Sequence, residues 1–129
     1  MEKVLVTGGL GFIGSNFIRH ALENWKDAEI TNVDCVSYGA VPANLSDLEG
    51  NPRYRFVKGD VSDIELLGGL VSGVDLLVHF AAETHVDRSI SNPERFLHSN
   101  TVGTFALLNA AKKSSKLRRF VHISTDEVY

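Results

Sequence analysis

Near its start the chain reads Val4-Leu5-Val6-Thr7-Gly8-Gly9-Leu10-Gly11-Phe12-Ile13-Gly14. The first four residues are largely apolar and rich in β-branched side chains, which is typical of a buried parallel strand, and the glycines permit a tight turn. Apolar side chains then recur at three- and four-residue steps from Phe12 to Trp25, which predicts a helix. The chain therefore opens with a strand, a glycine-rich turn and a helix.

The alternation of strand and helix continues along the rest of the chain. Further strands are expected at residues 29–33, 54–58, 74–80 and 118–124. Helices are expected at residues 64–71 and 93–113, with a short one near 43–48 inside a long connection. This pattern predicts an α/β fold of Rossmann type, a doubly wound parallel sheet with strand order 3-2-1-4-5. The fold is expected to be truncated after the fifth strand, which is left as a sheet edge.

Composition narrows the classes of protein to consider. With 129 residues, 43% of them hydrophobic, we expect one domain spanning residues 1–129, without a substrate domain. The net charge of -3 argues against binding to nucleic acid. The single cysteine, Cys35, cannot form an internal disulfide, which favours a reducing compartment. No cysteines and histidines are spaced like zinc ligands, so we expect no metal. No leader-like segment or membrane-length apolar run is present, so we expect a cytoplasmic protein that does not bind a membrane.

The glycine turn predicts a dinucleotide site. Gly8, Gly11 and Gly14 let backbone N–H groups approach a pyrophosphate at the positive end of the following helix. Asp34 follows Gly14 by twenty residues, at the end of the second strand, where a carboxylate accepts hydrogen bonds from a ribose. Its charge would repel a 2′-phosphate, and Cys35 comes next where an arginine would accept one, so NAD is predicted over NADP. The alternative is a plain strand-helix corner with a solvated aspartate.

A third element of this site follows the third strand. Gly59-Asp60-Val61 is placed where it would hold the edge of the adenine ring. The alternative interpretation, an ordinary turn or helix cap, carries equal weight.

Three segments carry a resemblance to a known family. The stretch from Thr7 to Ser15 is similar to the opening of extended short-chain dehydrogenase/reductases. His79-Phe80-Ala81-Ala82-Glu83-Thr84-His85-Val86-Asp87-Arg88-Ser89-Ile90 and Ser124-Thr125-Asp126-Glu127-Val128-Tyr129 resemble the fourth- and fifth-strand signatures of dTDP-glucose 4,6-dehydratases. Related sugar epimerases carry small polar residues in place of Asp126-Glu127. The sequence departs from many dehydratases at Cys35, at Thr84 and over residues 39–42.

The resemblance implies a reaction and roles for three residues. NAD would oxidise the sugar of dTDP-glucose at C4, water would leave across C5 and C6, and the hydride would return to C6. Thr125 would hydrogen-bond the C4 oxygen, Asp126 would be the acid and Glu127 the base, since elimination needs carboxyl groups in opposite protonation states. Both carboxyl groups reach one sugar only if the strand has ended by Asp126. The alternative is a solvated acidic pair at a helix start.

The remaining contacts implied by the resemblance line the crevice beyond the sheet. Substrate contacts are expected from Glu83, His85 and Thr125, although His85 is equally suited to a backbone hydrogen bond. Ser99 and Asn100 are either site residues or buried packing residues. The residues predicted to bind NAD are Gly8, Gly11, Phe12, Ile13, Gly14, Asp34, Cys35, Ser37, Asp60, Val61, Phe80, Ala81, Ala82, Thr84 and Ser99.

One part of the family's machinery is absent from the sequence. The Tyr-x-x-x-Lys pair that takes the hydroxyl proton occurs only as Tyr54 and Lys58, which lie in a predicted strand and match by chance. The chain is therefore interpreted as the N-terminal part of a nucleotide-sugar dehydratase, inactive alone, whose parent enzyme is a homodimer. The alternatives are a nucleotide-sugar 4-epimerase or decarboxylase, and a non-catalytic NAD-binding regulatory module.

Overall fold

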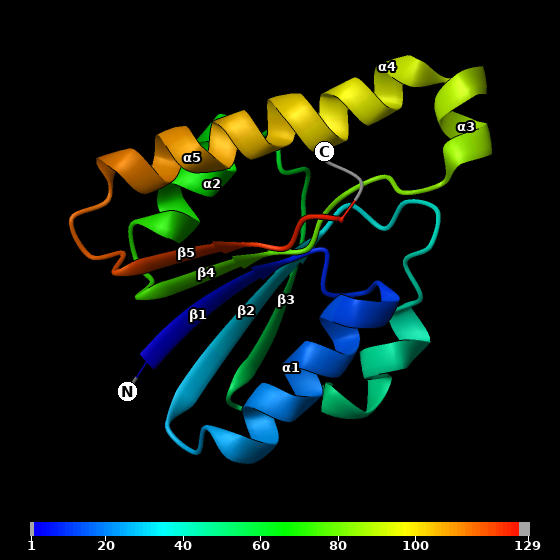
Figure 1. Cartoon of the computed structure of the whole chain (residues 1–129). Helices are drawn as coiled ribbons and strands as arrows, with labels where there is room; N and C mark the ends of the chain where they lie inside the picture. Colours follow the sequence, from blue (N-terminus) through cyan, green and yellow to red (C-terminus); the bar gives the residue numbers. More distant parts are fainter. Residues whose placement is uncertain (1, 127–129) are drawn as a thin grey trace.

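The computed structural model describes residues 2–126 and contains the predicted parallel sheet. Its order is β3-β2-β1-β4-β5, as predicted, and every neighbouring pair is parallel (Figure 1). The strands are β1 (Glu2–Thr7), β2 (Ala28–Asp34), β3 (Tyr54–Lys58), β4 (Leu76–His79) and β5 (Arg119–His122). The α/β prediction is therefore confirmed, with β5 at one edge of the sheet.

Helices cover both faces of the sheet. Helix α1 (Phe12–Asn24) and the short 3-10 helix η1 (Pro42–Leu48) lie on one face, and α2 (Ile64–Val71) and α5 (Thr104–Lys113) lie on the other (Figure 1). Side chains of β1 alternate between the two resulting cores, because successive residues of a strand point to opposite faces. Val4 and Val6 pack in the core that includes Ile18 of α1, whereas Leu5 packs with Leu67 and Leu107.

The predicted helix at 93–113 is one rod made of three segments. These are α4 (Pro93–Phe96), a π-helical stretch η2 (Leu97–Gly103) and α5 (Figure 1). The rod packs closely at Gly103, since a Cβ there would be 2.5 Å from Cγ2 of Val61. Apolar periodicity indicates that a helix exists but does not distinguish the wider π turn.

The bounds of two predicted strands need correction, and one helix was not predicted. The strand expected at 74–80 is limited to Leu76–His79, and the one expected at 118–124 ends at His122. The apolar runs continue beyond the paired residues, although Ile123 N–H still donates to His79 O at 3.0 Å. A six-residue helix, α3 (Val86–Ser91), was missed because its polar sequence has no apolar period.

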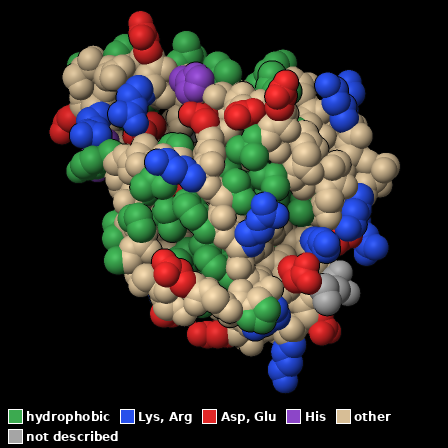
Figure 2. Space-filling view, turned by 180° about the vertical axis from the view of Figure 1, so that it is seen from behind, with side chains coloured by type: hydrophobic (Ala, Val, Ile, Leu, Met, Phe, Trp, Pro, Cys, Tyr) green, Lys and Arg blue, Asp and Glu red, His purple; other side chains and the backbone are tan. Residues whose placement is uncertain are grey.

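Figure 2 shows the opposite face of the molecule, where charged side chains of both signs surround a group of hydrophobic ones. No helix among residues 2–126 is both long and apolar enough to span a lipid bilayer.

Candidate functional site

The predicted NAD residues converge at the carboxyl ends of the strands, where open parallel sheets bind their ligands. Fourteen of the fifteen lie at or just after the ends of β1, β2, β3 and β4, and the remaining one, Ser99, lies on η2. Those after β1 are Gly8, Gly11, Phe12, Ile13 and Gly14; those at the end of β2 and after it are Asp34, Cys35 and Ser37; those after β3 are Asp60 and Val61; those after β4 are Phe80, Ala81, Ala82 and Thr84.

The glycine turn is shaped by close backbone approach. Gly8 has a φ of +73°, and a Cβ there would lie 2.5 Å from the amide nitrogen of Ala81. A Cβ at Gly14 would overlap the carbonyl oxygen of Gly8. The segments after β1 and β4 are therefore in backbone contact, and α1 begins directly beneath the turn at its N-cap Gly11. Only glycine fits these two positions.

Phe12 and Ile13 open helix α1 beside this turn. Their side chains are 81% and 59% exposed, unusual values for large apolar groups. A ligand lying along the start of α1 would cover apolar surface there as well as approach the helix N-terminus.

Asp34 holds the turn from the neighbouring strand. Its carboxylate is buried, with Oδ2 accepting from Leu10 N–H at 3.0 Å and Oδ1 from Val36 N–H at 2.8 Å. Each oxygen has a second lone pair for a ribose hydroxyl. Cys35, the next residue, is exposed.

Asn32 supports the glycine turn and was missed in the sequence analysis. It is buried in β2, and its Oδ1 accepts from Gly9 N–H at 3.0 Å while its amide donates to the Tyr54 hydroxyl at 3.1 Å. A polar residue inside an apolar strand was the available signal, because buried amides require partners.

The connection after β2 meets the segment after β4 through aromatic contacts. The Arg88 guanidinium lies 3.7 Å from the ring centroid of Tyr38, a cation–π contact. The His85 ring packs edge-on against the same ring, with centroids 5.0 Å apart. Since β1 lies between β2 and β4, these contacts bridge the two sides of the glycine turn.

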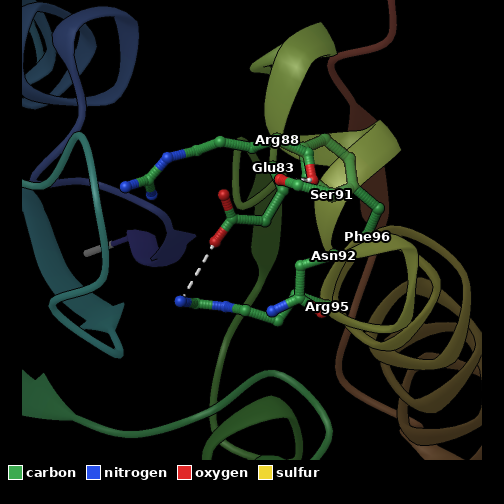
Figure 3. Close-up of a pocket in the computed structure, with 6 residues that line it drawn as sticks. All are labelled: Glu83, Arg88, Ser91, Asn92, Arg95 and Phe96. Carbon is green, nitrogen blue, oxygen red and sulfur yellow. Dashed lines mark hydrogen bonds and ion pairs between the residues drawn. The ribbon is translucent and has the colours of Figure 1, made fainter.

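Glu83 is held in a fixed place at the start of the predicted substrate segment. The Asn100 side chain accepts from its N–H at 2.8 Å and donates to its carbonyl at 2.9 Å. Arg95 lies 3.4 Å from its carboxylate (Figure 3). Asn100 is exposed, so its interpretation as a buried packing residue was wrong.

A cavity of about 230 Å³ opens beside Glu83. Figure 3 shows the Glu83 carboxylate between the guanidinium groups of Arg88 and Arg95, which extend from the α3 and α4 side. The lining is completed by Ser91, Asn92 and Phe96. The cavity thus combines one carboxylate with two cations at the end of β4.

The predicted catalytic residues follow β5. Because this strand ends at His122, Thr125 and the bend at Asp126 lie outside regular strand geometry, as the acid-base hypothesis requires. Both residues are exposed. Glu127 lies outside the described residues.

His79 forms a buried cross-link below the site. Its Nδ1 is 2.7 Å from the Thr7 hydroxyl and its Nε2 is 3.0 Å from the Thr104 hydroxyl, so it joins β1, β4 and α5. Burial, with a smaller contribution from His122, lowers the pKa of His79 to about 4. The ring is therefore neutral at physiological pH. No group of three His, Cys, Asp or Glu side chains in the described part of the chain is arranged to hold a metal ion.

Comparison with known proteins identifies the family. Residues 5–129 match the family model described as GDP-mannose 4,6 dehydratase. The chain is 50% identical over 126 residues to the low-salt glycan biosynthesis protein Agl12 of Haloferax volcanii, covering 98% of this chain and 40% of that protein. It is 46% identical to a dTDP-glucose 4,6-dehydratase of Mycobacterium tuberculosis, covering 98% of this chain and 37% of that one.

Solved structures agree with these relatives. DesIV, a dTDP-glucose 4,6-dehydratase from Streptomyces venezuelae with NAD and TYD bound, superposes with a TM-score of 0.92 at 46% identity, over 98% of this chain and 40% of its own. A UDP-Glc/GlcNAc 4-epimerase from Campylobacter jejuni gives 0.85 at 32% identity, over 98% and 38%. The chain spans about 40% of the length of these proteins. It belongs to the GDP-mannose 4,6 dehydratase family of extended short-chain dehydrogenase/reductases, where it corresponds to the N-terminal part of proteins like the dTDP-glucose 4,6-dehydratases.

Proposed function

We propose that this chain is the NAD-binding part of a nucleotide-sugar 4,6-dehydratase, with dTDP-glucose as the substrate of the whole enzyme. The observation that carries the proposal is the joined arrangement of glycine turn and carboxylate. Gly8 has no room for a side chain against Ala81, and Asp34 accepts from Leu10 N–H in the same turn. This geometry supports a pyrophosphate on the backbone N–H groups and a ribose on Asp34.

The buried charge of Asp34 also supports the choice between dinucleotides. Two backbone N–H groups already bond its carboxylate, so the charge is fixed beside the turn. A 2′-phosphate would bring further negative charge next to it without a new cation, because Cys35 follows. When bound, NAD would supply the hydride acceptor and donor for the reaction.

The proposed chemistry of this chain lies beyond β5. Thr125 would orient the C4 oxygen of the sugar, Glu127 would take the proton from C5, and Asp126 would give a proton to the C6 hydroxyl as it leaves as water. Support comes from the position of Thr125 and Asp126 after the strand end, and from the acidic pair itself.

The NAD site is tested by Asp34→Asn, which keeps the shape and one acceptor oxygen. NAD binding should weaken by about 1.5–3 kcal/mol, the scale of a lost hydrogen bond to a charged group. Isothermal titration calorimetry of the 129-residue chain measures this, with NADP as the second ligand. Asp27→Asn, an exposed carboxylate in the turn before β2, is the matched control. Equal NAD affinity in wild type and Asp34→Asn would remove Asp34 from the site.

The dehydratase assignment is tested in an enzyme that contains this chain together with its substrate-binding part. Glu127→Gln should permit oxidation at C4 but slow the elimination about 10²–10⁴-fold, the typical contribution of a general base. Exchange of the C5 hydrogen with deuterated water reports the step, and Glu94→Gln, an exposed acid on α4, is the control. Exchange at the wild-type rate would contradict the base assignment.

A nucleotide-sugar 4-epimerase is the second candidate, because 4-epimerases share the fold of this chain closely. The two candidates differ in product. A dehydratase releases a 4-keto-6-deoxy sugar, whereas an epimerase releases the C4 epimer with its C6 hydroxyl intact, and mass analysis of the product separates them.

A further inference from the structure

Asp60, two residues after β3, is linked through Ser62 to a residue of a distant helix. Its Oδ1 accepts from Ser62 N–H at 2.8 Å and from the Ser62 hydroxyl at 2.7 Å. The same hydroxyl is 2.8 Å from Nε2 of His98, which lies on η2, and that nitrogen is 3.6 Å from Asp60 Oδ1. Three side chains from two parts of the sequence therefore form one chain of hydrogen bonds.

The direction of these hydrogen bonds follows from the number of protons. A serine hydroxyl has one proton, and Ser62 donates it to Asp60. The hydroxyl oxygen must then accept from His98, so Nε2 of His98 carries a hydrogen. His98 donates to Ser62 and Ser62 donates to Asp60, and each bond polarises the next.

These contacts leave one oxygen of Asp60 for another donor. Among the described residues, both hydrogen bonds to the carboxylate and its closest approach to His98 involve Oδ1. Partial burial raises the pKa of Asp60, but the hydrogen bonds from Ser62 and the nearby His98 ring outweigh this and hold the pKa below its usual value. Oδ2 is therefore an ionised acceptor whose direction is set by the bonds to Oδ1.

The helix that carries His98 is fixed against the same loop. Val61, next to Asp60, is buried, and a Cβ at Gly103 would lie 2.5 Å from its Cγ2. Gly103 and His98 belong to the same π-helical stretch. The close approach at Gly103 thus holds the imidazole at a set distance from Ser62.

We propose that His98 is a positioning residue which, through Ser62, aims Asp60 Oδ2 at the 6-amino group of adenine and so sets the preference for an adenine dinucleotide. The proposal rests on the NAD site of the proposed function. An amino group donates to a carboxylate, whereas the 6-oxo group of hypoxanthine is an acceptor and would be repelled. The ratio of affinities for the two bases reports the aim of Asp60 directly.

The experiment compares binding of NAD and of nicotinamide hypoxanthine dinucleotide to the 129-residue chain by calorimetry. The wild type should prefer NAD at least about tenfold, because a site built to bond an amino group rejects an analogue without one. In His98→Ala and in Ser62→Ala this preference should fall about threefold to tenfold, the effect of losing a partly exposed charge-assisted bond. His98→Gln, whose amide also donates, should keep most of the preference. His20→Ala, an exposed histidine of α1, is the matched control and should leave the ratio unchanged.

A structural role alone would weaken both dinucleotides equally and leave the ratio constant. An unchanged ratio in His98→Ala, with NAD bound normally by the wild type, would overturn this inference and leave the proposed function standing. A wild type that binds NAD without preferring it over the hypoxanthine analogue would do the same. Failure of the wild type to bind NAD would overturn the proposed function and this inference with it.

Discussion

Replacing Gly8 by alanine is expected to destabilise the folded chain by about 3–5 kcal/mol, through positive-φ strain together with overpacking. The φ of +73° disfavours any side chain, and the new Cβ would lie 2.5 Å from the nitrogen and 2.6 Å from the Cα of Ala81. These are backbone atoms just after β4 and cannot rotate away as a side chain could. The turn would have to separate from the segment after β4, so NAD binding should be lost as well.

Urea denaturation followed by circular dichroism measures this difference, and two other glycines separate its causes. Gly39→Ala also requires a positive φ, +89°, but its Cβ meets nothing within 4 Å, so it should cost only about 1–2 kcal/mol. Gly68→Ala, in the middle of α2 with open space around it, should stabilise the chain by about 0.5–1 kcal/mol. A Gly8→Ala variant no less stable than Gly39→Ala would show that the contact with Ala81 is not essential.

Between pH 6.5 and pH 4 the free energy of unfolding is expected to fall by about 3 kcal/mol because of His79. In the folded chain the pKa of His79 is lowered from 6.5 to about 4, first by burial and then by His122. Below pH 6.5 the unfolded chain binds a proton that the folded chain rejects, so acid favours unfolding. This contribution stops growing below about pH 4, where both states are protonated.

The effect of His79 on stability occurs in a different pH range from the effects of the carboxylates. The hydrogen bond from Arg19 lowers the pKa of Asp47, and the one from Lys3 N–H lowers the pKa of Asp75, both below the usual 3.8. Their stabilisation is lost at lower pH than that of His79. In His79→Gln the amide can still bond Thr7 and Thr104. The fall in the free energy of unfolding between pH 6.5 and pH 4 should therefore largely disappear. An equal slope in wild type and His79→Gln, measured by urea denaturation at each pH, would contradict this origin.

The fold could be predicted from the sequence because the apolar periodicity and the glycine-rich turn indicate the same strand-turn-helix arrangement. The strand before Gly8 and the helix after it are both apolar on the buried side, and right-handed crossovers leave few strand orders. The π-helical stretch Leu97–Gly103 and helix α3 could not be predicted, since apolar periodicity does not distinguish a π-helix from an α-helix and the short α3 has no apolar period.

The positions of the candidate site residues followed from the sequence, but the hydrogen bonds that connect them to other elements did not. Spacing placed Gly8, Asp34 and Asp60 at strand ends, where the structure has them. The hydrogen bonds within this region join residues far apart in sequence, such as Gly9 to Asn32 and Glu83 to Asn100. No local pattern encodes such pairs, because they depend on how neighbouring elements pack. The roles of Thr125, Asp126 and Glu127 remain predictions.

The π-helical turn between α4 and α5 contacts both ends of the crevice within three residues. His98 bonds the loop after β3, and Asn100 bonds the segment after β4 through both backbone groups of Glu83. Because β3 and β4 lie on opposite sides of β1, this one helical segment connects the two sides of the crevice. A shift of the rod along its axis would therefore move its contact with Ser62 and its contact with Glu83 together, which couples the loop after β3 to the segment after β4.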